Sequence, residues 1–198
     1  MSLEVITDKL VARCLQDSVA VKQQLLEDEQ YQAQVLSLGN AMARALASGR
    51  KAIFFGNGGS AADAQHLAAE LTGRYMMERP GLAGLSLTSN TSSLTAIGND
   101  YSYDMIFARQ LEAIGCVGDV ALGISTSGTS TNVVCAMDLA RSKGMTTAAL
   151  TGKTGGALLS RVDYCIRIPS ECTPRIQEAH ILTGHILCEI IEYELFAK

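Results

Sequence analysis

Three histidines occur in the 198-residue chain, and His66 has a carboxylate at helical spacing in Glu70. His66 and Glu70 are four residues apart, so in a helix their side chains lie on one face. An imidazole and a carboxylate at that spacing can bind a divalent metal or act as an acid–base pair. Isolated pairs of this kind usually face solvent, so on these two residues alone the chemical and the structural interpretation both stay open.

The last apolar segment of the chain carries the other two histidines. Gln177 and His185 are eight residues apart, so they lie on a common stripe of a helix. His180 lies on a different face of the helix from His185, and we expect it to be a packing or surface residue. If the helix of His66 and the last helix line one cavity, His66 and His185 can meet there.

A glycine-rich segment, Gly56-Asn57-Gly58-Gly59-Ser60, follows an apolar run. Its glycines permit positive φ and close approach to an anion. Ser60 can cap the next helix, whose free N–H groups favour negative charge. The segment has neither the lysine of a Walker loop nor the third glycine of the dinucleotide motif. A tight turn without a ligand remains an equal alternative.

A hydroxyl-rich segment, STSGTS at 125–130, follows another apolar run and contains five hydroxyls and one glycine. Hydroxyls and backbone amides can together bind the three oxygens of a phosphate without a lysine. Since a helix cap needs only one hydroxyl, we favour phosphate binding over a plain cap. The turns Gly98-Asn99-Asp100 and 151–156 are weaker signals, expected at the same rim.

Short apolar runs alternate with helical segments from residue 51 onward. The runs are expected strands, at 52–55, 82–87, 120–124, 146–150 and 164–168. The helical segments lie at 60–72, 92–97, 104–115, 130–143, 156–161 and 174–196. This alternation predicts an α/β fold, a doubly wound, flavodoxin-like sheet of five parallel strands. The ligand should then lie at the carboxyl ends of the strands.

Residues 1–50 are expected to be helical almost throughout and to form an N-terminal extension of a single domain spanning 1–198. Since these helices precede the first strand, they are not crossover helices. An apolar face on such a helix favours packing against another subunit. The alternative is that the extension covers one edge of its own domain.

Composition narrows the classes of partner. The net charge is −4 and no run of Lys or Arg occurs, so direct nucleic-acid binding is not expected. The sequence has no stretch of 18 apolar residues, so no membrane span is expected. Residues 1–17 do not resemble a secretory signal. The six cysteines form no C-x-x-C pair and are typical of reduced thiols in a cytoplasmic protein.

Six segments of the chain occur together in one order: GNGGSAADAQHLAAELTGRY, ERP, LTAIGNDYSYD, GDVALGISTSGTSTNV, LTGKTGG and RIQEAHILTGH. In this order they resemble the SIS-domain (sugar isomerase) family and, more narrowly, the phosphoheptose isomerases, over essentially the whole chain. The resemblance implies an aldose–ketose isomerase that converts D-sedoheptulose 7-phosphate to D-glycero-D-manno-heptose 7-phosphate. That reaction is the first step of bacterial ADP/GDP-heptose precursor biosynthesis, which supplies glycans such as lipopolysaccharide.

The resemblance also implies a role for each matching residue. Glu70 and His185 match the acid–base pair. The positions that bind zinc, one ion per subunit, are His66, Glu70, Gln177 and His185. The substrate-binding positions are Asn57, Gly58, Gly59, Ser60, Glu70, Asn99, Asp100, Ser125, Thr126, Ser127, Ser130 and Gln177. Family members are homotetramers with sites between subunits, which Arg74 would reach from a neighbour. Some members carry Asp where this chain has Pro174, so that position offers no catalytic group here.

Three other functions stay open on the sequence. A related SIS-domain branch binds the bacterial replication initiator without catalysis, and it lacks the acid of the helix and the second histidine that this chain has as Glu70 and His185. A sugar-phosphate sensor would use the same pocket without turnover. An isomerase of another sugar phosphate is the third alternative, because the loops specify phosphate better than chain length.

Overall fold

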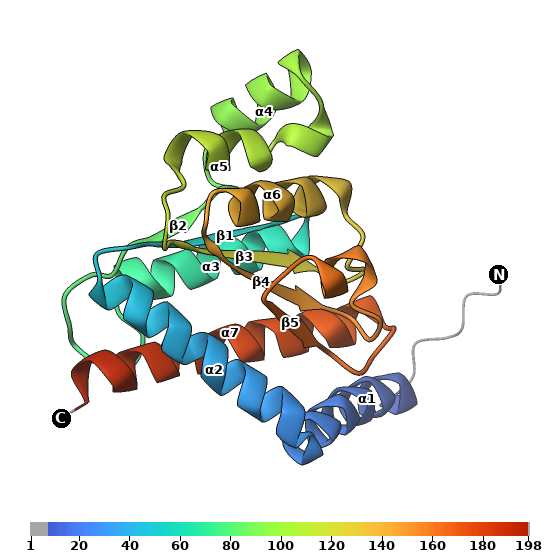
Figure 1. Ribbon diagram of the computed structural model, residues 1–198. Coiled ribbons are helices and arrows are strands. Elements are labelled where there is room, and N and C mark those ends of the chain that lie inside the picture. The colour runs from blue at the N-terminus through green and yellow to red at the C-terminus, as the bar shows by residue number, and fades with distance from the viewer. Residues whose placement is uncertain (1–7, 198) are drawn as a thin grey trace.

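The computed structural model describes residues 8–197 and confirms the predicted sheet of five parallel strands (Figure 1). The strands are β1 Ala52–Gly56, β2 Gly84–Ser86, β3 Val120–Ser125, β4 Thr146–Thr151 and β5 Tyr164–Arg167. Their order is β2-β1-β3-β4-β5, and all neighbouring pairs are parallel. The order reverses between β1 and β3, so the loops after these two strands border the switch point where such sheets bind ligands.

Helices cover both faces of the sheet, with α2, α3 and α7 on one face and α5 and α6 on the other (Figure 1). The helices are α1 Asp8–Glu27, α2 Glu29–Ala47, α3 Gly59–Thr72, α4 Thr91–Asp100, α5 Ala108–Ile114, α6 Thr131–Ser142 and α7 Thr173–Phe196. Within β1, Phe54 packs on the first side, whereas Ile53 and Phe55 pack on the second. Burial on both faces explains why the strands are continuous apolar runs.

The N-terminal extension forms the two helices α1 and α2. Asp28 caps α2 by accepting a hydrogen bond from the Tyr31 N–H at 2.9 Å. Val35, Leu38 and Met42 bury one face of α2 against its own domain, where α7 and β5 contact it. Of the two alternatives expected for the extension, α2 therefore follows the second: it covers its own domain. On α1, several large apolar side chains remain exposed.

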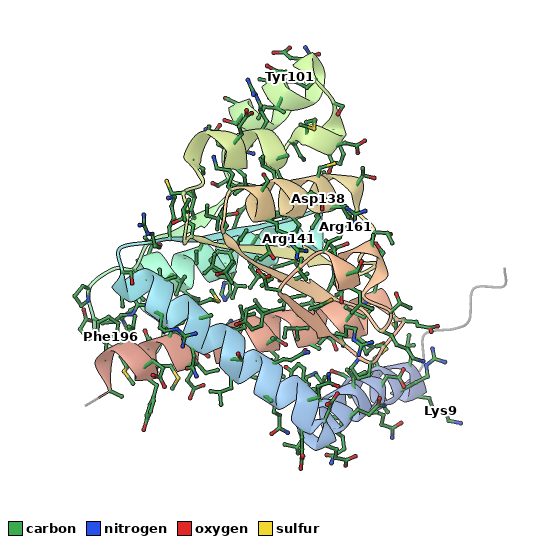
Figure 2. The ribbon with its side chains drawn as sticks, viewed as in Figure 1. Lys9, Tyr101, Asp138, Arg141, Arg161 and Phe196 are labelled. Carbon is green, nitrogen blue, oxygen red and sulfur yellow. The ribbon has the colours of Figure 1, made fainter. Side chains whose placement is uncertain are left out.

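The region between β2 and β3 differs from the expectation. The helix expected at 92–97 runs from Thr91 to Asp100, because the Asn90 side chain caps it and no proline stops it at Gly98. Asn99 and Asp100, expected at a strand-end rim, therefore lie in the last turn of α4. Figure 2 places the next residue, Tyr101, at the outer tip of the molecule, opposite Lys9 on α1.

Two other expected helices are modified. The segment at 104–115 divides into a 3₁₀ turn, η1 Tyr103–Met105, and α5, while the segment at 156–161 is the 3₁₀ helix η2 Gly156–Ser160. An exposed ion pair between Asp138 on α6 and Arg161 joins η2 to the neighbouring helix, with 2.7 Å between its charged atoms (Figure 2). No helix within residues 8–197 is long and apolar enough to cross a membrane.

Candidate active site

The glycine-rich loop after β1 lies at the switch point. Gly56 pairs with Ile124 in the sheet register, so this loop begins beside the loop after β3. A Cβ atom on Gly56 would lie 2.7 Å from the Ile124 carbonyl oxygen, and Gly58 has a φ of 57°, so both positions need glycine. The predicted helix cap by Ser60 is wrong. Gly58 occupies the cap position of α3, and Ser60 is buried in the first turn.

The hydroxyl-rich loop after β3 gathers its side chains at the start of α6. The Ser125 hydroxyl lies 2.9 Å from that of Ser130, and the Ser127 hydroxyl accepts a hydrogen bond from the Thr129 N–H at 3.2 Å. Ser130 precedes α6 without capping it through its side chain. The loop thus groups several hydroxyls at a helix N-terminus, an arrangement suited to a phosphate.

Two asparagines, Asn57 and Asn132, join these loops, and only Asn57 was expected from the sequence. The Asn57 amide donates to Asn132 Oδ1, and the Asn132 amide donates to Asn57 Oδ1, both at 2.9 Å. The Tyr103 hydroxyl also donates to Asn57 Oδ1 at 2.9 Å. Because Asn132 is buried, it fixes the orientation of the Asn57 amide at the switch point. Its position two residues after the STSGTS segment was the available signal.

The expected acid–base residues meet between α3 and α7. His66 Nε2 lies 2.9 Å from His185 Nε2 and 3.3 Å from a carboxylate oxygen of Glu70. These ligand atoms of His66, Glu70 and His185 all lie within 4.8 Å of one another, close enough for one metal ion. The helix spacing of His66 and Glu70 therefore does bring both side chains to one site.

Other side chains surround this cluster. The Tyr75 ring stacks on His185 with 5.6 Å between ring centroids and 26° between planes. Gln177 packs on the glycine loop, where a Cβ on Gly59 would lie 2.5 Å from its Nε2. Burial raises the pKa of Asp63, one turn before His66, while the nearby His66 charge opposes that rise.

Two residues of α7 near the cluster are packing groups. Burial raises the pKa of the Cys188 thiol to about 12, so the thiol is neutral at physiological pH. His180 is fully buried and its Nε2 lies 3.1 Å from the Thr151 carbonyl oxygen. The expectation that His180 packs rather than joins His185 is confirmed.

Cavities lie beside both loops. One of about 380 Å³ is lined by residues that include Asn57, Gly58, Thr88 and Tyr103. Another of about 250 Å³ is lined by residues that include Thr126, Ser127, Lys153 and Ser170. The candidate site residues on both loops therefore border open space that a ligand can enter.

One pair of expected substrate-binding residues stands apart from the rest. Asn99 and Asp100 are exposed, and the Asn99 amide donates to the Asp100 carboxylate at 2.9 Å. Their neighbour Gly98 lines the cavity beside the glycine loop. Within this chain, the two side chains thus lie at the edge of the candidate site rather than in it.

Comparison with known proteins identifies the family. The SIS domain family model matches residues 15–152. Phosphoheptose isomerase 2 of Campylobacter jejuni is 51% identical over 182 residues, 92% of this chain and 90% of the relative. The phosphoheptose isomerase of Sulfurimonas denitrificans is 48% identical over 188 residues, 95% of this chain and 96% of the relative.

Solved structures agree with the sequence matches. A phosphoheptose isomerase from Neisseria gonorrhoeae superposes with a TM-score of 0.85 at 42% identity, covering 93% of this chain and 97% of that one. The enzyme from Francisella tularensis gives 0.88 at 36% identity, covering 94% and 98%. With the switch-point loops and the imidazole–carboxylate cluster in place, the chain belongs to the SIS-domain family, among the phosphoheptose isomerases.

Proposed function

We propose that this chain is an aldose–ketose isomerase that converts D-sedoheptulose 7-phosphate to D-glycero-D-manno-heptose 7-phosphate. The observation that carries the proposal is that His66 and Glu70 of α3 meet His185 of α7, a helix distant in sequence. The relatives, about half identical over more than nine-tenths of the chain, bear the name of this isomerase.

In the proposed reaction, Glu70 and His185 move protons on carbon and on oxygen, respectively. Glu70 takes a proton from C1 of the ketose, and the C–H electron pair forms the C1–C2 double bond while His185 gives a proton to O2. His185 then takes the proton of O1, the C1 carbonyl forms, and Glu70 returns its proton to C2. One carboxylate can serve both carbons because they are adjacent in the cis-enediol.

The donor set suits a zinc ion, which we propose as the cofactor. Two imidazole Nε2 atoms face each other at 2.9 Å beside a carboxylate, and imidazole and carboxylate are common zinc ligands. His66, Glu70 and His185 would hold the ion, with Gln177 as the further ligand that the family resemblance implies. Bound there, zinc would supply Lewis-acid stabilisation of negative charge on the sugar oxygens.

The phosphate of the substrate is assigned to Ser125, Thr126, Ser127 and Ser130, next to the glycine loop. His66 follows Gly59 by seven positions on α3, which corresponds to roughly 10 Å along the helix. An open-chain sugar phosphate is an extended molecule whose reacting C1–C2 end is far from the phosphate on C7. The separation of the loops from the cluster supports this orientation of the substrate.

We further propose a homotetramer, located in the cytoplasm, that supplies a heptose phosphate for bacterial glycan precursors. Support for assembly comes from apolar side chains that α1 leaves exposed, among them Leu15 and Val19. Support for the compartment comes from the six cysteines, which are free thiols. A site between subunits would also bring residues such as Arg74 to a neighbouring cluster.

The binding alternative is less well supported than catalysis. An adaptor for a replication initiator or a sugar-phosphate sensor requires the fold and the loops, but neither requires a carboxylate and an imidazole in contact range. Curated relatives about half identical to this chain bear the name of the isomerase rather than that of a binding protein.

The test is turnover of sedoheptulose 7-phosphate, followed by NMR, with added zinc and with a chelator. We expect Glu70→Gln and His185→Gln each to lower kcat by about two to four powers of ten, because each loses a proton-transfer group. Glu112→Gln, an exposed change on α5, is the matched control and should turn over like the wild type. Near wild-type rates in a folded Glu70→Gln or His185→Gln protein would remove that residue from the chemistry.

A further inference from the structure

A buried ion pair joins the segment after α3 to α7. The Arg79 guanidinium Nε lies 2.9 Å from Glu192 Oε1, and both side chains are about 1% exposed. Removing both charges from water is costly unless every polar atom finds a partner. Here the Glu192 carboxylate also accepts hydrogen bonds from the N–H groups of Tyr75, Met76 and Met77, at 2.9, 2.8 and 2.8 Å.

These contacts stabilise the ionised form of the Glu192 carboxyl group. Burial alone raises the pKa of the carboxyl, but the three backbone hydrogen bonds and the Arg79 guanidinium together hold the pKa below its usual value. The ionised carboxylate thus fixes the backbone of three consecutive residues. A simple turn on the surface does not need a buried charge for that purpose.

Arg79 in turn holds the end of α3. Its Nη2 donates to the Glu70 carbonyl oxygen and its Nη1 to the Leu71 carbonyl oxygen, both at 2.8 Å. A second contact joins Nη1 to the Gly73 carbonyl oxygen at 3.1 Å. Carbonyl groups in the last turn of a helix lack partners within the helix, and a cation there is also favoured by the helix dipole.

This ion pair therefore connects the two helices that carry the candidate acid–base pair. The Arg79 contacts include the peptide carbonyl of Glu70 itself. Glu192 follows His185 by seven residues, two turns along the same face of α7. Tyr75 lies in the segment after α3. Its backbone N–H donates to Glu192, and its ring stacks on the His185 imidazole.

From this geometry we infer that the Arg79–Glu192 pair and Tyr75 act as a positioning unit, which holds Glu70 and the His185 ring in the orientation required for isomerisation. The inference rests on the proposed function and adds residues for which the family resemblance gave no role. Tyr75 is a positioning residue and not a catalytic one, because it acts through His185. Displacements of about an ångström in a catalytic group can cost on the order of a hundredfold in rate.

Tyr75 provides the sharpest test, because its side chain is only partly buried and packs at the edge of the core, where leucine still fills part of the space. We expect Tyr75→Leu to lower kcat by about 10- to 100-fold while KM changes by less than about threefold, since phosphate binding is untouched. Tyr75→Phe keeps the ring and should restore most of the rate. Met76→Ala is the matched control, because it removes a neighbouring side chain that is 67% exposed.

A second measurement reports on His185 directly. The chain has only three histidines, so NMR of histidine labelled with ¹³C at Cε1 alone gives three ring signals, which His66→Gln and His180→Gln variants assign. We expect Tyr75→Leu and Glu192→Gln each to move the His185 signal, while the His180 signal stays in place. If Glu192→Gln fails to fold, Arg79→Lys replaces it, because lysine cannot make the several directed contacts of the guanidinium.

The two proposals fail in different ways. A wild-type protein without isomerase activity would overturn the proposed function, and the NMR shifts would still test the positioning of His185. A Tyr75→Leu protein with kcat within twofold of wild type and an unmoved His185 signal would overturn the positioning role. Equal losses of kcat in Tyr75→Leu and Tyr75→Phe would do so as well, because stacking would then not be the cause.

Discussion

His180 is held neutral in the core, and this gives the protein a specific response to acid. Burial lowers the pKa of His180 to about 4, although its hydrogen bond to the Thr151 carbonyl opposes that shift. In the unfolded chain a histidine has a pKa of about 6.5. As pH falls from about 6.5 towards 4, the unfolded state takes up a proton that the folded state does not, so the free energy of unfolding decreases.

We therefore expect His180→Gln to weaken the pH dependence of stability. A glutamine amide can donate to the same carbonyl but does not titrate. Between pH 7 and pH 5 the variant should lose about 2 kcal/mol less stability than the wild type, measured by urea unfolding at both values. His66→Gln, an exposed change, serves as the control. The same loss in His180→Gln and wild type would mean that His180 does not stay neutral.

The residues of the candidate site differ in how far the sequence could predict them. Glycines and hydroxyls in a short loop carry a local signal, so Gly58 and Ser127 were candidates from the residues alone. The meeting of His66 and His185 spans 119 positions, so the residues alone made it a possibility and the family resemblance made it an expectation. The Arg79–Glu192 pair was missed because charged residues are normally exposed, and only the fold shows that these two are buried.

At the scale of elements, the loops after β3 and β4 support each other through glycines. Gly128 has a φ of 68°, and a Cβ on it would lie only 2.1 Å from the Gly155 carbonyl oxygen. The Gly152 N–H donates to the Thr126 carbonyl at 3.0 Å, and the Leu158 N–H donates to the Gly128 carbonyl at 3.1 Å. The 151–156 turn, a weak signal in the sequence, thus packs directly on the proposed phosphate loop.

Gly128→Ala should accordingly cost both stability and substrate affinity. The left-handed backbone conformation costs a side chain about 1–2 kcal/mol, and the contact with Gly155 forces the two loops apart as well. We expect KM to rise more than kcat falls, because phosphate is bound in the ground state and the transition state alike. Steady-state kinetics and thermal unfolding measure the two effects.

Gly49→Ala separates the backbone effect from the contact. Gly49 has a similar φ of 72°, but nothing lies within 4 Å of a Cβ placed there. This variant should lose only the stability that the left-handed backbone conformation costs an alanine, and it should keep its KM. If Gly49→Ala and Gly128→Ala lose equal stability and both keep KM, the packing of the two loops does not hold the phosphate site.

Helices and strands begin and end close to the expected residues where a single local pattern, such as a continuous apolar run, determines them. The central strands β1, β3 and β4 are continuous apolar runs and occupy the expected positions, each extended by one residue. β2 was expected at 82–87 but covers only Gly84–Ser86, because an edge strand pairs on one side alone. The single helix expected at 104–115 divides where Tyr103 bonds Asn57 and Phe107 packs on Phe55, contacts that no local pattern contains.

At the scale of the whole molecule, α1 presents an apolar stripe to solvent. Val11, Leu15 and Val19 follow one another at four-residue spacing and are 59%, 63% and 64% exposed. A shallow cavity of about 330 Å³, lined by residues that include Leu36, Ile190 and Tyr193, adds apolar surface on α2 and α7. Apolar stripes of this kind are typical of surfaces that another subunit covers.

Leu15→Glu tests whether this stripe holds the proposed tetramer together. A charge placed in an apolar interface loses its hydration without gaining a partner, so the assembly should dissociate to smaller species, measured by size-exclusion chromatography with light scattering. Val117→Glu is the control, because Val117 is 69% exposed but lies between α5 and β3, away from α1. Circular dichroism should show both variants folded, since neither side chain is in the core. A wild-type protein that is monomeric at micromolar concentration would exclude the tetramer, and a Leu15→Glu protein that stays tetrameric would place its contacts elsewhere.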